Sequence, residues 1–200
     1  MKTSIKNIGA ALAALSLSAA AQAVTVDFNS ISGFQSVGPV YVESGFQFAN
    51  SGGRTDDLFS WGQGSVYNAN PLGNTLNHNY GGTTTTLSRV GGGTFTFNSI
   101  DLADVYNYAN GGDVRFLFTT SGGSSSQTVS LDQLVGLETF SFNISNLLSV
   151  AWTPLTTNGQ WLQLDNVNVD NGTSNVPEPA SLALFGLALA GLASSRRKSK

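Results

Sequence analysis

Short runs of alternating apolar and polar residues recur along the middle of the chain and predict β-strands. Residues 24–29 read Val-Thr-Val-Asp-Phe-Asn and residues 45–49 read Gly-Phe-Gln-Phe-Ala, so the apolar side chains of each run fall on one face. Glycine pairs and an Asn-Gly step, which favour tight turns, separate the runs. Further runs of this type lie at 84–90, 93–97, 99–105, 114–119, 127–131, 138–144, 147–153 and 160–169.

The spacing of these runs predicts an all-β fold. About eight to ten strands separated by turns favour a single β-sandwich of jelly-roll type over residues 24–172. A segment of this size buries enough surface for one independent core, and the chain has no Cys, so core packing or bound ions must stabilise it. One helical turn is expected at 130–136, where Ser130 and Gln133 fit a capping box and Gly136 ends the pattern.

The first 23 residues have the features of a secretory signal peptide. Lys2 and Lys6 precede an apolar stretch of Ala and Leu, which predicts a helix, and Ala21 and Ala23 supply the small residues that signal peptidase requires. The abrupt change to alternating residues at Val24 indicates where the exported protein begins. A buried Ala-rich helix is the alternative, but the basic flank and the cleavage pattern favour export.

Residues 177–200 form a tail of three parts, which a linker at 173–176 precedes. Two prolines bar a helix at its start and leave an extended dipeptide that a protease could grip. The apolar part, 181–193, would cover as a helix about 20 Å of a hydrocarbon core of about 30 Å, which suits a transient hold in a membrane. The basic end should stay cytoplasmic, which places the domain outside the inner membrane. The residues that carry these features are Val176, Pro177, Glu178, Pro179, Arg196 and Arg197.

This arrangement resembles the PEP-CTERM sorting signal of Gram-negative bacteria, which has Val-Pro-Glu-Pro, a short apolar helix and an Arg-rich end. The same tail is sometimes labelled after an ice-binding protein that carries it, and that label does not describe the domain. The resemblance implies that an exosortase cuts the tail near the Pro-Glu-Pro segment after a transient stay in the inner membrane. It also implies delivery to the cell surface or to an exopolysaccharide matrix. A permanent single-span membrane anchor is the alternative.

Charge is distributed unevenly between the ends and the middle of the chain. Six of the nine Lys and Arg residues lie in the termini, so residues 24–176 contain three Arg, no Lys and eleven acidic residues. Binding to phosphates needs clustered Lys or Arg, and nucleic acid is therefore excluded as a partner. The single His and the absence of Cys also make a binuclear or Cys-based metal site hard to build.

The sequence contains no constellation typical of catalysis, and we expect no enzymatic activity. A Ser-His-Asp arrangement would need His78, but no G-x-S-x-G nucleophile motif is present, so a polar loop histidine is the expectation. Paired carboxylates could still serve glycoside hydrolysis, because distance along the chain does not fix distance in space. The candidates for such a pair are Asp56, Asp57, Asp101 and Asp104.

Aromatic residues are the better candidates for binding. Residues 52–82 lack sustained periodicity, which predicts a long loop rich in Asn, Gly and aromatic residues. Aromatic rings stack on the apolar face of a sugar, and Asn or Asp side chains bond its hydroxyls. Core packing is the alternative for each ring. The tentative ligand residues are Trp61, Tyr67 and Tyr80, with Tyr106 and Tyr108 in a similar segment.

The first and last predicted strands carry a candidate calcium site. Asp27 and Asn29 lie on the polar face of the first strand, and a shift in apolar parity within the last strand indicates a bulge at Asp165. An Asp-Phe-Glu/Asn opening and a Leu-Asp-Asn-Val closing resemble the terminal strands of carbohydrate-binding-module-like jelly rolls. The resemblance implies one structural Ca²⁺, an ion that prefers such oxygen ligands. An Asx-type turn or an edge charge at Asp165 is the alternative.

Three functions are consistent with the sequence. The leading hypothesis is an exported, non-enzymatic surface or exopolysaccharide-matrix protein that an exosortase sorts. A carbohydrate-binding module is the first alternative, and a secreted glycan hydrolase or lyase is the second. Signal peptidase, the exosortase and transiently the inner membrane are the expected partners in processing, and exopolysaccharide is the candidate partner of the mature domain.

Overall fold

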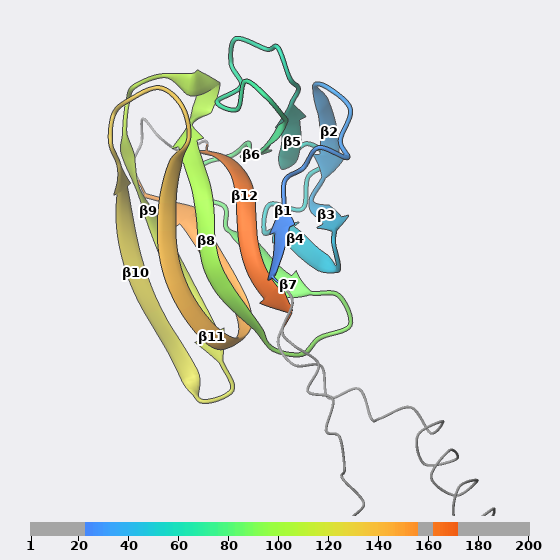
Figure 1. The fold of residues 1–200 in the computed structure, drawn as a ribbon, viewed down its shortest axis with the longest axis vertical. Helices are drawn as coiled ribbons and strands as arrows, with labels where there is room; N and C mark the ends of the chain where they lie inside the picture. The colour runs from blue at the N-terminus through green and yellow to red at the C-terminus, as the bar shows by residue number, and fades with distance from the viewer. Residues whose placement is uncertain (1–22, 156–161, 172–200) are drawn as a thin grey trace, which may run out of the picture.

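Antiparallel strands account for nearly all the regular structure of the described residues (Figure 1). The computed structural model describes residues 23–155 and 162–171, so the predicted signal peptide except Ala23, the linker and the tail lie outside it. No helix among the described residues has the length and apolarity needed to cross a membrane. The elements are β1 (Ala23–Val26), β2 (Gln35–Gly38), β3 (Val40–Glu43), β4 (Phe46–Asn50), β5 (Leu58–Trp61), β6 (Thr75–His78), β7 (Thr85–Arg89), β8 (Phe95–Asp104), the 3-10 helix η1 (Val105–Asn107), β9 (Gly112–Thr120), β10 (Gly123–Leu131), β11 (Glu138–Pro154) and β12 (Leu162–Asn171).

The strands form one continuous hydrogen-bonded sheet that folds over at β11 into a β-sandwich. One layer has the strand order β2-β5-β6-β12-β8-β11, and the other has the order β3-β4-β7-β11-β9-β10. The first half of β11 pairs with β8, whereas its second half lies between β7 and β9. The predicted all-β sandwich of jelly-roll type is therefore confirmed.

Two asparagines bend β11 between the layers. The pairing of β11 with β8 shifts register between Ser141 and Ile144 and again between Ile144 and Leu147. Asn143 and Asn146 fall in these two shifts and have φ angles of 54° and 58°. Asparagine tolerates this left-handed backbone, and bulges of this kind bend a strand and increase its twist. The sequence predicted two strands here, at 138–144 and 147–153, and the structure joins them into one.

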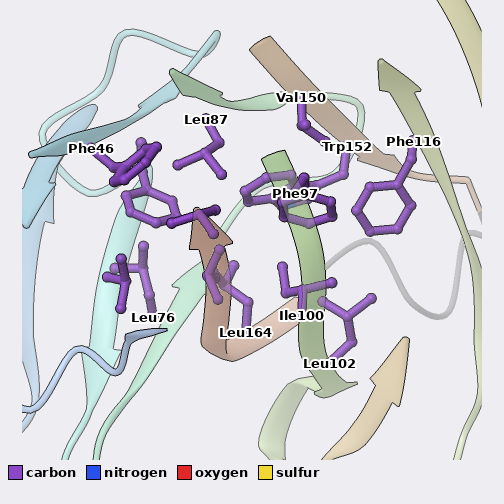
Figure 2. Packing of buried hydrophobic residues seen from close by; sticks show 14 of the residues in the cluster. Phe46, Leu76, Leu87, Phe97, Ile100, Leu102, Phe116, Val150, Trp152 and Leu164 are labelled. Atoms are coloured by element: carbon purple, nitrogen blue, oxygen red, sulfur yellow. The ribbon is translucent and has the colours of Figure 1, made fainter. Parts of the chain in front are cut away.

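The core lies between the two layers and is rich in phenylalanine (Figure 2). Phe97 of β8 faces Phe116 and Phe118 of β9 across the core, with ring centroids 6.3 Å apart in both pairs. Trp152 of β11 is fully buried in the core and contacts Phe48 of β4. All members of the buried cluster lie between Val26 and Val169 in the chain, so this segment carries its own core.

The first and last strands meet, as the sequence predicted. β1 pairs with β12 in antiparallel register from Ala23 with Asp170 to Val26 with Val167. The bulge predicted in β12 is also present, because the pairing with β8 shifts register after Asp165 and Asn166 has a φ of 45°.

The helical turn predicted at 130–136 is wrong. β10 runs on to Leu131, and Ser130 donates a hydrogen bond from Oγ to Asp113 Oδ1 of β9 instead of capping a helix. The residues that follow form a turn in which Gln133 has a φ of 63°. Nine successive pairs with β9 outweigh the short local signal for a helix.

The segment 52–82 contains two short strands that its pattern did not predict. All four residues of β6 and three of the four in β5 are buried, so neither strand alternates between buried and exposed positions. Leu58 and Leu76 lie in the core on one face of these strands, whereas Phe59 and Thr75 on the other face contact Phe34 and Gln163. A strand buried on both faces has no period of two, which explains why the sequence indicated a single loop.

Candidate functional site

Six aromatic rings form a connected set, here called the aromatic cluster. Trp61 lies at its centre and stacks on Phe34 with centroids 4.8 Å apart. Trp61 also contacts Tyr67 at 5.2 Å and Tyr106 at 5.9 Å. The members of the aromatic cluster are Phe34, Phe59, Trp61, Tyr67, Tyr106 and Tyr108.

Separate segments of the chain bring these rings together. Phe59 and Trp61 are two residues apart on β5 and so project from the same face of that strand. Phe34 directly precedes β2, which pairs with β5. Tyr106 comes from η1, where its φ of 57° is an uncommon conformation for a bulky residue. Strained backbone of this kind persists only where the surroundings impose it, and it is frequent at binding sites.

Part of the aromatic cluster faces solvent. Phe34 is 67% exposed, Tyr108 53% and Tyr67 40%. Single exposed apolar residues are ordinary, but these exposed rings are linked through Trp61 and Tyr106 into one set, which makes the surface a candidate for binding. Trp61 Nε1 is buried and has no hydrogen-bond partner among the described residues, so an unused donor lies within the same cluster.

The aromatic cluster borders a cleft of about 210 Å³. Aromatic and polar side chains line the cleft together, and Asp56 is the one charged residue among those that line it. Rings supply stacking surface, while the carboxylate, amide and hydroxyl supply directional hydrogen bonds. The lining residues are Phe34, Ser36, Asp56, Phe59, Trp61, Asn79 and Tyr106.

Tyr80 does not line the cleft, but it contacts Asp56, which does. Its hydroxyl donates a 2.6 Å hydrogen bond to Asp56 Oδ2, and the ring lies 4.4 Å from the Arg54 guanidinium carbon. The hydrogen bond to Asp56 is the main reason that the pKa of Tyr80 is raised above its usual value. Asn79 Nδ2 donates to the Asp56 backbone carbonyl at 2.8 Å. Asp56 is therefore held in place by both neighbours.

Gln163 fixes the loop that carries Tyr67, and its role was not predicted. It is fully buried on β12, and its Oε1 accepts hydrogen bonds from Ala69 N at 3.0 Å and Thr75 Oγ1 at 2.9 Å. Its Nε2 donates to the carbonyls of Tyr67 at 2.7 Å and Asp104 at 2.9 Å. One amide thus ties the loop after β5 to β6 and to the residue before η1.

His78 is a buried strand residue, so the expectation of a polar loop histidine is wrong. Its Nε2 lies 2.7 Å from the Tyr80 carbonyl and its Nδ1 3.0 Å from Thr85 Oγ1. Burial lowers the pKa of His78 below its ordinary value, which favours a neutral ring that donates from Nε2 and accepts at Nδ1. These contacts position the turn between β6 and β7.

The four acidic residues considered for hydrolysis do not form a pair in the cleft. Asp56 lines it, but Asp57 is fully buried and accepts a hydrogen bond from Arg54 N at 2.6 Å. Asp104 Oδ2 accepts from the backbone at 110 and 111, and Asp101 bonds Thr139 and the side chain of residue 166. These three carboxylates serve turns and strand contacts.

The predicted calcium ligands meet the requirements for a site only in part. Asp165 is fully buried, and burial raises its pKa to about 7, with the charges of Asp101 and Asp27 adding to the effect. Asp165 Oδ2 accepts from Asn70 Nδ2 at 2.6 Å, whereas Asn29 Oδ1 accepts from Asn74 N at 2.9 Å. No group of three or more acidic, His or Cys side chains among the described residues could hold a metal. Asp27 and Asp165 would be the carboxylate ligands of any Ca²⁺ there, with amide oxygens completing the set.

A family model places the tail in a known class of signal. The PEP-CTERM protein-sorting motif matches residues 175–198. The predicted resemblance of the tail is confirmed. The motif implies an exported protein that an exosortase processes and that reaches the cell surface or the extracellular space. The motif residues and the signal-peptidase residue Ala21 lie outside the described structure, and Ala23 begins β1.

Comparisons of the domain itself give distant likenesses. No curated protein matches the chain. Among solved structures, the K2 cleaved adhesin domain of Lys-gingipain has a TM-score of 0.48 at 11% identity and covers 75% of this chain and 99% of its own. An F5/8 type C domain from Bacteroides fragilis has a TM-score of 0.43 at 10% identity, with coverages of 66% and 95%. TmCBM61, solved with β-1,4-galactotriose, has a TM-score of 0.39 at 12% identity, with coverages of 72% and 92%.

Proposed function

We propose that the protein is a surface or exopolysaccharide-matrix component whose β-sandwich binds polysaccharide at the aromatic cluster without cleaving it. The observation that carries the proposal is a cleft lined by both aromatic rings and hydrogen-bonding groups. Sugars present this combination of surfaces, an apolar ring face and a rim of hydroxyls. The sorting motif supports the proposal, because an extracellular protein meets polysaccharide where it is delivered.

The negative charge of the cleft favours some classes of polysaccharide over others. Asp56 lines it, and the residues 24–176 have an excess of eight acidic over basic residues. An anionic sugar would meet like charge at the site, which weakens binding, whereas a neutral or amine-bearing sugar would not. We therefore propose uncharged or cationic sugar units as the ligand class, with Phe34 and Trp61 as the stacking surface.

Binding without cleavage is supported by the placement of the carboxylates. Glycoside hydrolysis ordinarily uses two carboxyl groups about 5 to 10 Å apart on either side of the scissile bond. Among the described residues that line the cleft, Asp56 alone carries a carboxyl group, and its Oδ2 accepts the Tyr80 hydroxyl. A reducing-sugar assay tests this point, and release of reducing ends would establish the hydrolase alternative.

Affinity electrophoresis in the producing organism's own exopolysaccharide tests binding. The wild-type domain should migrate more slowly with polysaccharide in the gel, and Phe34→Ala should lose most of that retardation because one exposed stacking ring is gone. Leu117→Ala is the matched control, since this side chain is 43% exposed but lies on β9. Unretarded wild-type protein, or equal retardation of wild type and Phe34→Ala, would refute the proposed site.

A further inference from the structure

β10 forms a long open edge of the β-sandwich (Figure 1). β10 pairs with β9 over nine residues without a register shift, and within 23–155 and 162–171 no strand pairs with its other side. Residues 123–128 of β10 are all exposed. In antiparallel pairing alternate residues turn their N–H and C=O groups away from the partner strand, so β10 presents a row of backbone donors and acceptors.

The features that normally protect an edge strand are missing from β10. Edge strands are usually short, irregular or marked by Pro and charged residues. β3, at the far end of the same layer, has four residues, follows Pro39 and ends at Glu43. β2, at the end of the other layer, has four residues and an irregular register. The nine residues of β10 include no charge and no Pro.

The sequence of β10 is complementary to itself. If two copies pair antiparallel with full overlap, Gln127 lies opposite Gln127 on the two-fold axis. Ser126 then faces Thr128, and Ser124 faces Ser130, so these two pairs consist of uncharged hydrogen-bonding side chains, and no pair of the nine-residue overlap brings two charges together. The excess of eight acidic residues in 24–176 would make two copies repel each other. β10 carries no charged side chain, so pairing of two β10 strands sets no like charges opposite each other. A two-fold contact also covers both open edges at once.

We propose that β10 is a self-association strand, through which two copies of this chain pair antiparallel and extend the layer across both molecules. Backbone hydrogen bonds along nine residues would supply the affinity, and the register would centre on Gln127. This inference does not depend on polysaccharide binding, because the strand and the aromatic cluster share no residue.

A cysteine at the two-fold axis tests the register directly, since the chain has no Cys of its own. Opposed Cα atoms in an antiparallel pair are about 4.5 to 5.5 Å apart, within the range that a disulfide spans. Full-length Gln127→Cys, exported into an oxidising periplasm, should give a disulfide-linked dimer on non-reducing electrophoresis. Val42→Cys on β3, which is 53% exposed, is the control and should stay largely monomeric. Equal dimer yields from the two variants would overturn the proposal.

Lysines on the strand provide a second test without a covalent bond. Ser126→Lys with Thr128→Lys would set lysines opposite each other on both sides of the axis. The wild-type exported protein should show a dimer fraction that rises with concentration in analytical ultracentrifugation, and the double variant should remain a monomer. Val40→Lys with Val42→Lys on β3 should dimerise like wild type. A wild-type monomer at all concentrations, or dimers that persist in the β10 variant, would overturn the proposal.

Discussion

At the scale of single residues, Asp165 is a fully buried carboxyl group whose pKa burial raises from the ordinary 3.8 to about 7. Between these two pH values the folded state holds a proton that the unfolded state has lost. The stability of the calcium-free protein should therefore rise as the pH falls from about 7 towards 4. At about 1.36 kcal/mol per pKa unit, the contribution has an upper bound of roughly 4 kcal/mol.

Thermal melts in EDTA between pH 8 and pH 5 measure this contribution. His78 opposes it, because its lowered pKa means that the unfolded state takes up the proton first as the pH falls below about 6.5, which destabilises the fold in acid. Comparison with Asp165→Asn separates the two residues, since that variant keeps His78 and lacks the buried acid. If wild type and Asp165→Asn show the same pH dependence, Asp165 does not titrate in this range.

The calcium site expected from the sequence is tested at the same residue, because the described residues supply no group of three acidic, His or Cys ligands there. Ca²⁺ binds the ionised carboxylate, so millimolar Ca²⁺ should raise the melting temperature by a few degrees at pH 8 and by less at pH 5. Asp165→Ala should abolish the response, and Asp27→Ala should weaken it. Asp113→Ala is the control, because Asp113 bonds Ser130 on β10. A melting temperature that Ca²⁺ leaves unchanged at pH 8 would show that the terminal strands bind no calcium.

The sequence indicates candidate site residues only where the signal lies in the neighbouring residues of the chain. Of the candidate ligand residues, Trp61 and Tyr67 lie together in the aromatic cluster, and aromatic residues in a Gly- and Asn-rich segment are a visible signal. Tyr80 does not line the cleft, and Phe34 and Gln163 were missed. Phe34 precedes an ordinary strand, and Gln163 lies between two leucines, where alternation indicates an exposed residue. Its burial depends on a loop about ninety residues away in the chain.

At the scale of elements, the loop between β5 and β6 depends on Gln163. Gln163→Leu keeps the approximate volume but leaves the carbonyls of Tyr67 and Asp104 without their donor and the Ala69 amide without its acceptor. Buried unsatisfied groups cost about 1 to 3 kcal/mol each. We expect a loss of at least about 2 kcal/mol in the free energy of unfolding.

Denaturant unfolding gives the stability of the Gln163→Leu variant, and affinity electrophoresis gives its binding. The variant should also lose retardation by polysaccharide, because Tyr67 is no longer held against Trp61. Gln47→Leu is a suitable control, since Gln47 is half-buried on β4 and belongs neither to the aromatic cluster nor to β10. An unchanged free energy of unfolding in Gln163→Leu would contradict the role given to this amide.

Strands could be predicted from the sequence where one face of the strand is buried and the other is exposed to solvent. β1, β4 and β9 alternate cleanly in sequence and in burial, so their runs predicted them. β5 and β6 escaped detection because both faces are covered. The helix expected at 130–136 failed because pairing with β9 continues through Leu131, a constraint between strands that a local capping pattern does not express.

At the scale of the whole molecule, β1 and β12 bring the two ends of the domain together, with Ala23 opposite Asp170. Signal-peptidase cleavage after Ala23 would leave Val24 at the N-terminus, still paired with Val169. We predict that the mature protein begins at Val24 and has lost its tail. Intact-mass measurement of surface-released protein checks both ends at once. A species that retains residues 182–200 would contradict cleavage and support a permanent anchor.

Sorting of the whole molecule should depend on the basic end of the tail. The apolar segment 181–193 would span about 20 Å as a helix, which is short for a hydrocarbon core of about 30 Å. A segment this short inserts weakly, so its orientation and retention rely on cytoplasmic charges. Replacing Arg196, Arg197, Lys198 and Lys200 with Gln should therefore reduce surface delivery severalfold.

The folded domain provides the control for this last prediction. Among the described residues, the core cluster runs from Val26 to Val169. The variant whose four basic tail residues are replaced by Gln should therefore melt at the same temperature as wild type. A smaller amount of the variant at the cell surface then reports on sorting, because the folding of the domain is unchanged. Quantitative immunoblots of surface and cell fractions measure the distribution, with Lys2→Gln and Lys6→Gln as a comparison that affects the other end of the chain. Equal surface delivery of wild type and the tail variant would show that the motif at 175–198 works without its basic residues.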